Sequence, residues 1–263
     1  MNITIDKIEQ EAWKDSILHR LDGRIKLILT ILIIVYAVYT TDFLVLLLLE
    51  IYLIILLLFS KVSIGYFIKR VLIILPFGGF IAIFQLFIKP GLVIYTLPLG
   101  LTISYEGIIF GALLLSRLIV CLSAISLLSS VTPLETIVNS MRKLGFPKEM
   151  SMILSMTVRY VFVFFDELQN ILKAQKSRSF NIWNKKTSYI WRIKQIGYTI
   201  MMLFLKSFEK GERVYYSMLA RGYVGETTSL QKENPIRYID YGIIVLTLIV
   251  IFSVEIANTT GII

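Results

Sequence analysis

The sequence predicts an all-α, polytopic membrane protein with about five transmembrane helices and long amphipathic helices on the cytoplasmic side. Two observations support this fold class. Apolar residues make up 56% of the 263 residues and charged residues only 17%, whereas soluble domains average about 45–50% and 25%. The apolar residues also gather in runs long enough to cross a bilayer. This composition argues against a soluble enzyme and a disordered chain, and a single cysteine leaves no disulfide framework.

The first element is a polar N-terminal tail, residues 1–24, which we expect in the cytoplasm. Met1 to Asp22 carry charged residues throughout and contain no apolar stretch of the kind that defines a signal peptide. The first apolar run begins only after Lys26.

Five apolar runs predict the membrane spans, since a helix needs about 20 residues to cross the bilayer and about 17 at least. The first run is short and needs Lys26 to extend its ammonium to the membrane surface. We assign four spans to residues 25–131 and the last span to residues 238–263. A sixth would require part of Met150 to Phe165 to enter the bilayer. The runs are Leu27 to Tyr39, Phe43 to Phe59, Val71 to Ile88, Gly107 to Ser130 and Tyr241 to Ala257.

Basic residues predict the orientation. Residues 139–237 contain 17 Lys and Arg against 7 Asp and Glu, a net charge of +10, whereas the rest of the chain nets −1. Lysine and arginine concentrate on the cytoplasmic side of membrane proteins. Five spans place this segment inside together with Lys61, Lys69 and Arg70. The N-terminus is then cytoplasmic, and the loop from Lys89 to Glu106 and the C-terminus face outward.

Residues 132–237 are predicted to form a cytoplasmic helical domain. Thr132-Pro133-Leu134-Glu135 is a capping box with proline at the first helical position, and Gly145 can end this short helix. Pro147 opens a second helix that extends to about Arg178, which corresponds to roughly 50 Å. A third helix ends at Arg221-Gly222. Apolar stripes follow steps of three and four residues, and include Phe165 and Leu168 on the second helix and Ile200, Phe204, Phe208, Tyr215 and Met218 on the third.

The sequence contains no nucleotide-binding loop and no metal-ligand motif. No Gly-x-x-x-x-Gly-Lys-Ser/Thr segment is present, and one histidine and one cysteine do not form a metal site. The ionisable residues within the runs are Glu50 and Arg117, with Glu106 at a boundary. Such residues are functional candidates, but we favour a structural pairing of Glu50 with Arg117. We therefore expect no catalytic residue, no metal and no cofactor in this chain.

A series of motifs resembles one family. Each is weak alone, but their order and spacing along most of the chain are specific. They resemble the transmembrane coupling (T) subunit of energy-coupling-factor (ECF) transporters, most closely the CbiQ branch of cobalt and nickel importers. The motifs are Ser16-Ile-Leu-His-Arg-Leu-Asp22-Gly-Arg24-Ile-Lys26, Glu106-Gly107 with Arg117, Thr132-Pro133, Leu144-Gly145-Phe146-Pro147, Arg159-Tyr160-Val-Phe, Ala174-Gln-Lys-Ser-Arg178, Glu212-Arg213-Val-Tyr, Met218-Leu-Ala-Arg-Gly-Tyr223 and Gly225-Glu226.

The resemblance implies two docking triplets. In that family two coupling helices each end in an Ala-Arg-Gly-like triplet that docks into a groove of an ABC-type ATPase. The second triplet matches outright as Ala220, Arg221 and Gly222, whereas the first reads Ser177, Arg178 and Ser179 and keeps only the arginine. A guanidinium at a helix end offers a planar set of donors for carboxylates. The simpler interpretation of Arg221 is that it complements the helix dipole before a glycine stop.

The resemblance also implies the partners. It implies two ABC ATPases, which carry ATP and Mg²⁺ and perform the hydrolysis, and a substrate-binding membrane subunit, CbiM-like for a metal importer. This chain is then a non-catalytic, multi-pass subunit in the lipid membrane of a prokaryotic cell. We expect Phe165, Leu168, Phe204 and Phe208 to pack between the coupling helices or against the substrate-binding subunit.

Alternatives from other classes predict different features. A T component of a vitamin importer is the nearest alternative. A secondary transporter needs repeated halves with broken spans, and only Pro76-Phe-Gly78-Gly79 interrupts a run. A membrane-embedded enzyme would depend on His19, Asp22, Arg24 and Glu106. A nucleic-acid partner is not expected, because the basic segment carries apolar residues at helical spacing.

Overall fold

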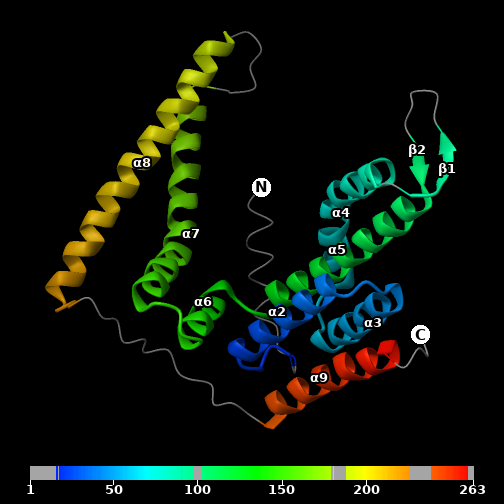
Figure 1. Cartoon of the computed structure of the whole chain (residues 1–263). Coiled ribbons are helices and arrows are strands. Elements are labelled where there is room, and N and C mark those ends of the chain that lie inside the picture. The colour runs from blue at the N-terminus through cyan, green and yellow to red at the C-terminus, as the bar shows by residue number, and fades with distance from the viewer. Residues whose placement is uncertain are drawn as a thin grey trace. The chain divides into compact units, whose positions relative to one another are not determined.

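The regular secondary structure of the described residues is helical apart from one small hairpin, as expected for an all-α membrane protein. The computed structural model describes residues 16, 18–89, 91–96, 102–178, 180, 188–224 and 238–259. The chain divides into two compact units, Met1–Ser140 with Glu233–Ile263, and Met141–Lys232. The helices are α2 (Gly23–Tyr39), α3 (Phe43–Ser60), α4 (Ile64–Ile88), α5 (Tyr105–Val131), α6 (Leu134–Lys143), α7 (Lys148–Ser177), α8 (Tyr189–Ala220) and α9 (Tyr238–Thr259) (Figure 1).

Each of the five predicted apolar runs lies within one helix. Within the described residues, α3, α4 and α5 are long and apolar enough to cross a membrane. Helix α2 has 17 residues, and α9 contains a shorter apolar stretch, Asp240–Ser253. The chain is therefore a membrane protein, with three such helices among the described residues, and the count of five spans stays a prediction.

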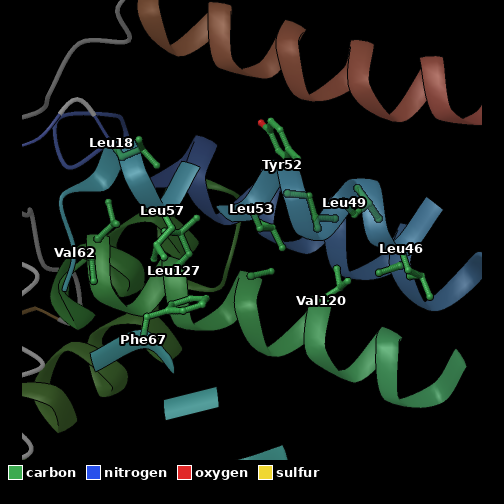
Figure 2. Packing of buried hydrophobic residues seen from close by; sticks show 14 of the residues in the cluster. Leu18, Leu46, Leu49, Tyr52, Leu53, Leu57, Val62, Phe67, Val120 and Leu127 are labelled. Carbon is green, nitrogen blue, oxygen red and sulfur yellow. The ribbon is translucent and has the colours of Figure 1, made fainter. Parts of the chain in front are cut away.

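The core of the first unit lies between α2, α3 and α5. Leu46 and Leu49 of α3 and Val120 of α5 are almost completely buried. Figure 2 shows Leu46, Leu53 and Leu57 gathered with Val120 and Leu127 of α5. Because lipid tails are as apolar as leucine, close packing rather than burial from water holds such helices together.

Small residues bring α4 and α5 into close contact. A Cβ atom added at Gly111 would lie 3.0 Å from the carbonyl oxygen of Ala82, and one at Gly107 would lie 2.9 Å from that of Leu86. Gly107 and Gly111 are four residues apart, so both lie on one face of α5. This spacing of small residues is the common interface of membrane helices.

We expect Gly111→Leu to separate α4 from α5 and to destabilise the chain by about 1–3 kcal/mol, the usual cost of overpacking. Gly79→Leu is the matched control, because a Cβ at Gly79 on α4 meets no atom within 4 Å beyond the backbone of its own helix. Unfolding in detergent, followed by circular dichroism, measures the difference between the two variants. Equal stability of Gly111→Leu and the control would contradict this packing.

Polar contacts along one face attach α9 to the other helices of the first unit. The backbone N–H of Asp22 donates to Oδ1 of Asp240 at 3.2 Å. Farther along α9, the hydroxyls of Tyr52 and Thr247 are 2.7 Å apart. Near the end of α9, the Tyr36 hydroxyl donates to Glu255 at 2.8 Å. Residues 240, 247 and 255 recur at helical spacing, so an apolar helix is anchored by three polar groups.

The loop between α4 and α5 contains a short antiparallel hairpin, β1 (Val93–Thr96) with β2 (Thr102–Ser104). Glu106 accepts the backbone N–H of Leu92 at 2.7 Å, and the Ser104 hydroxyl donates to the carbonyl of Lys89 at 2.6 Å. Glu106 therefore supports the base of this hairpin.

Candidate docking site at the ends of two long helices

Helices α7 and α8 form an antiparallel pair within the second unit (Figure 1). They contain 30 and 32 residues, which corresponds to about 45 and 48 Å. They are joined by an ion pair between Glu167 and Lys206 and by a hydrogen bond of 2.6 Å from Gln175 Nε2 to Thr199 Oγ1. In these contacts a higher residue number on α7 pairs with a lower residue number on α8, which is the antiparallel order. The C-terminus of α7 and the C-terminus of α8 therefore lie at opposite ends of the pair.

The C-terminus of α7 presents Arg178. Its backbone N–H donates to the carbonyl of Gln175 at 3.0 Å, and the N–H of Phe180 donates to the same carbonyl at 3.1 Å. The second contact, from the residue two positions past the cap, is the defining hydrogen bond of a Schellman motif. The predicted end at Arg178 is thus confirmed, and Ser179 lies outside the described residues.

The C-terminus of α8 presents Arg221 in the same way. The N–H of Tyr223 donates to the carbonyl of Met218 at 3.1 Å, and the N–H of Gly222 donates to that of Leu219 at 2.9 Å. Gly222 has a φ of +79°, a left-handed conformation that glycine adopts without steric cost. These contacts complete a Schellman motif, so Gly222 ends the helix immediately after the arginine.

The two helix ends at Arg178 and Arg221, called the arginine tips below, are both exposed. The side chains of Ser177, Arg178, Ala220 and Arg221 are all exposed to solvent. Within the described residues, neither guanidinium has a hydrogen bond or an ion pair. An unpaired guanidinium beside small residues can donate several parallel hydrogen bonds to carboxylates or carbonyls of a second protein.

The predicted packing residues fall into two groups. Phe165 and Leu168 on α7 are half-buried, whereas Phe204 and Phe208 on α8 remain 60% and 64% exposed. The half-buried and buried residues of the middle of α8, Thr199, Leu203 and Ser207, are mostly small or polar and follow steps of four. Phe204 and Phe208 are therefore available to another protein rather than committed to α7.

Two aromatic residues at these tips had no role assigned from the sequence, although Tyr223 closes one of the quoted motifs. Phe180 and Tyr223 each follow an arginine by two positions. The signal was present, because Ser177-Arg-Ser-Phe180 and Ala220-Arg-Gly-Tyr223 share one pattern of small, arginine, small and aromatic residues.

The intramembrane charges do not form the predicted pair. Arg117 donates from Nε to the carbonyl of Thr40 at 3.0 Å, and Glu50 accepts from the Ser123 hydroxyl at 2.8 Å. The pairing prediction was therefore wrong in its partners. A backbone carbonyl left free at the end of α2 satisfies the guanidinium instead.

The candidate residues of a membrane enzyme do not converge. Asp22 and Arg24 lie at the start of α2, where Lys26 donates to the carbonyls of His19 and Val131 at 3.1 and 3.4 Å. Val131 ends α5, whereas Glu106 lies in its first turn, about 40 Å away along a 27-residue helix. In the described part of the chain, no group of three or more His, Cys, Asp or Glu gathers as a metal site.

Comparisons with known proteins agree on one family. The model of the CbiQ family, described as a cobalt transport protein, matches residues 14–232. The chain is similar to the energy-coupling factor transporter transmembrane protein EcfT of Listeria innocua, with 32% identity over 220 residues, 80% of this chain and 82% of the relative. It is also similar to EcfT of Lactococcus lactis, with 30% identity and the same coverage, and to EcfT of Ruminiclostridium cellulolyticum, with 27% identity over 93% of both chains. The family model, over residues 14–232, includes both Arg178 and Arg221.

Proposed function

Because this chain belongs to the CbiQ family and is a transmembrane (T) component of the ECF type, we propose that it couples two ABC ATPases to a separate substrate-binding membrane subunit. One observation carries the docking part of this proposal. Arg178 and Arg221 end two long helices with the same hydrogen-bond pattern, exposed, at opposite ends of one antiparallel pair.

The proposed mechanism uses α7 and α8 as levers. ATP and Mg²⁺ bind to the partner ATPases, whose closing and opening carry Arg178 and Arg221 with them. The exposed apolar side chains of α8, among them Phe204 and Phe208, contact the substrate-binding subunit. Movement of the helix pair then tilts or reshapes that subunit until its site opens to the cytoplasm.

We place the helix pair and the N-terminus in the cytoplasm of a prokaryotic cell. The excess of lysine and arginine in residues 139–237 supports this orientation. ABC ATPases act on ATP in the cytoplasm, so docking at the arginine tips requires the same side.

For the substrate we propose cobalt, or nickel as the related metal. The description of the matching family as a cobalt transport protein supports this choice. One histidine and one cysteine in the whole chain supply few of the nitrogen and sulfur donors that such metals prefer. We therefore assign metal recognition to a CbiM-like partner. Coupling to a vitamin-binding subunit is the second candidate, because the similar EcfT proteins are named as energy-coupling factor transporter proteins without restriction to a metal.

Affinity purification of the tagged chain from its own membranes in mild detergent tests the proposal. Mass spectrometry should identify an ABC ATPase and a small membrane protein in the same complex. A small subunit with a histidine near its N-terminus would support the metal importer, whereas a different subunit would move the substrate to a vitamin. Absence of any ABC ATPase in several detergents would refute the coupling function and favour a secondary transporter.

A further inference from the structure

Each arginine tip is followed by an aromatic residue that contacts the other long helix. The Phe180 ring lies 5.5 Å from the ring of Trp191, with an angle of 65° between the planes. The Tyr223 hydroxyl donates to the sulfur of Met152 at 2.9 Å. Trp191 is the third residue of α8 and Met152 the fifth of α7. Each tip therefore rests on the first turns of the opposite helix.

The same aromatic residues also complete the helix ends. The backbone N–H groups of Phe180 and Tyr223 make the two hydrogen bonds that close the Schellman motifs around Arg178 and Arg221. Their side chains are half-buried between the helices. One residue thus fixes both the backbone turn that presents the arginine and the position of that turn on the neighbouring helix.

We infer that Phe180 and Tyr223 are positioning residues for the two docking tips, tying each arginine to the opposite helix so that the tips act as one unit. This inference rests on the proposed function. Fixing a docking group in its bound position before contact reduces the entropy lost on binding. A force applied by an ATPase at one tip is then shared by both helices instead of bending a single helix end.

The Tyr223 contact can be tested with two conservative variants. Tyr223→Phe removes only the donor, and Met152→Leu removes only the acceptor at nearly constant volume. Each should raise the dissociation constant of the co-purifying ATPases for the full-length, detergent-solubilised chain by about two- to tenfold, the usual range for one hydrogen bond. The double variant should equal either single variant, because one contact is lost in all three cases. Tyr216→Phe, on an exposed tyrosine of α8, is the control and should have no effect.

An Arg221→Ala background separates positioning from general stability. There the remaining affinity depends on Arg178, so Tyr223→Phe and Met152→Leu should cause no further loss. Phe180→Leu and Trp191→Leu should still weaken binding there by about five- to tenfold, because an aromatic pair contributes beyond its buried area. Losses that persist after Tyr223→Phe in this background, or additive losses in the Tyr223 and Met152 double variant, would overturn the inference.

Failure of the inference and failure of the proposed function give different results. Unchanged ATPase affinity in Arg221→Ala together with Arg178→Ala would overturn the docking function itself. Strong loss in that arginine double variant, with wild-type affinity in Tyr223→Phe and Phe180→Leu, would overturn only the positioning role.

Discussion

Replacing both Arg178 and Arg221 with glutamate is expected to abolish ATP-driven uptake while the chain still reaches the membrane. Both side chains are exposed and have no partner within the described residues, so the charge reversal should cost the chain itself within about 0.5 kcal/mol per site. At a docking surface, however, two donors of parallel hydrogen bonds become two repelling carboxylates. Losing a desolvated charge pair typically costs 2–5 kcal/mol or more. ATPase binding should therefore fall by more than about thirtyfold.

Uptake of radioactive cobalt into cells or vesicles, with the amount of chain in the membrane measured by immunoblot, checks this expectation. Arg213→Glu is the matched control, because Arg213 is an exposed arginine on α8 whose pair with Glu209 is also exposed. Such surface pairs contribute about 0–1 kcal/mol, so the control should transport normally. ATP-driven uptake by the double variant at the wild-type level would refute the docking role of both arginines.

Helix ends were the most predictable part of the site, because local chemistry determines them. Pro147 has no backbone N–H to donate, which suits the position just before a helix, so it marks the start of α7. Gly222 supplies the left-handed turn that ends α8. The apolar runs were equally predictable, because every backbone group in a lipid environment needs an internal hydrogen bond and a helix provides it. Each run accordingly lies inside one helix.

Contacts between elements were not predictable from these patterns. Arg117 donates to the carbonyl of Thr40, and Glu50 accepts from the hydroxyl of Ser123. Which of these contacts form depends on how the helices are rotated and shifted relative to one another, and sequence spacing does not determine either. The apolar stripe of α8 was likewise compatible with contact to α7 or to another subunit; Thr199 contacts α7, and Phe204 remains exposed. A helix with apolar side chains on several faces does not specify which face meets its neighbour.

Two further substitutions should separate the two halves of the coupling function. Phe204→Asp together with Phe208→Asp should leave ATPase binding intact and abolish capture of the substrate-binding subunit and uptake. Both rings are mostly exposed in this chain, at 60% and 64%, so the carboxylates cost the chain itself little. In a contact with a membrane subunit, each aspartate would instead bury an unpaired charge. Aromatic residues at the centre of an interface contribute about 2 kcal/mol or more each, so recovery of that subunit should fall more than about tenfold.

Co-purification quantified by mass spectrometry measures both partners in the same sample. Tyr216→Asp is the matched control: Tyr216 is 61% exposed on the same helix, and at 3.6 residues per turn it lies roughly 100° around the axis from the two phenylalanines.

Normal recovery of the small subunit by the phenylalanine variant would place the contact elsewhere, because a surface that accepts two carboxylates is not an apolar interface. Loss of the ATPases in the same variant would show that the α8 face and the arginine tips do not act separately. The expected pattern is retained ATPases with a lost substrate subunit, the reverse of the arginine double variant, and it assigns ATPase docking to the helix ends and capture of the substrate subunit to the apolar face of α8.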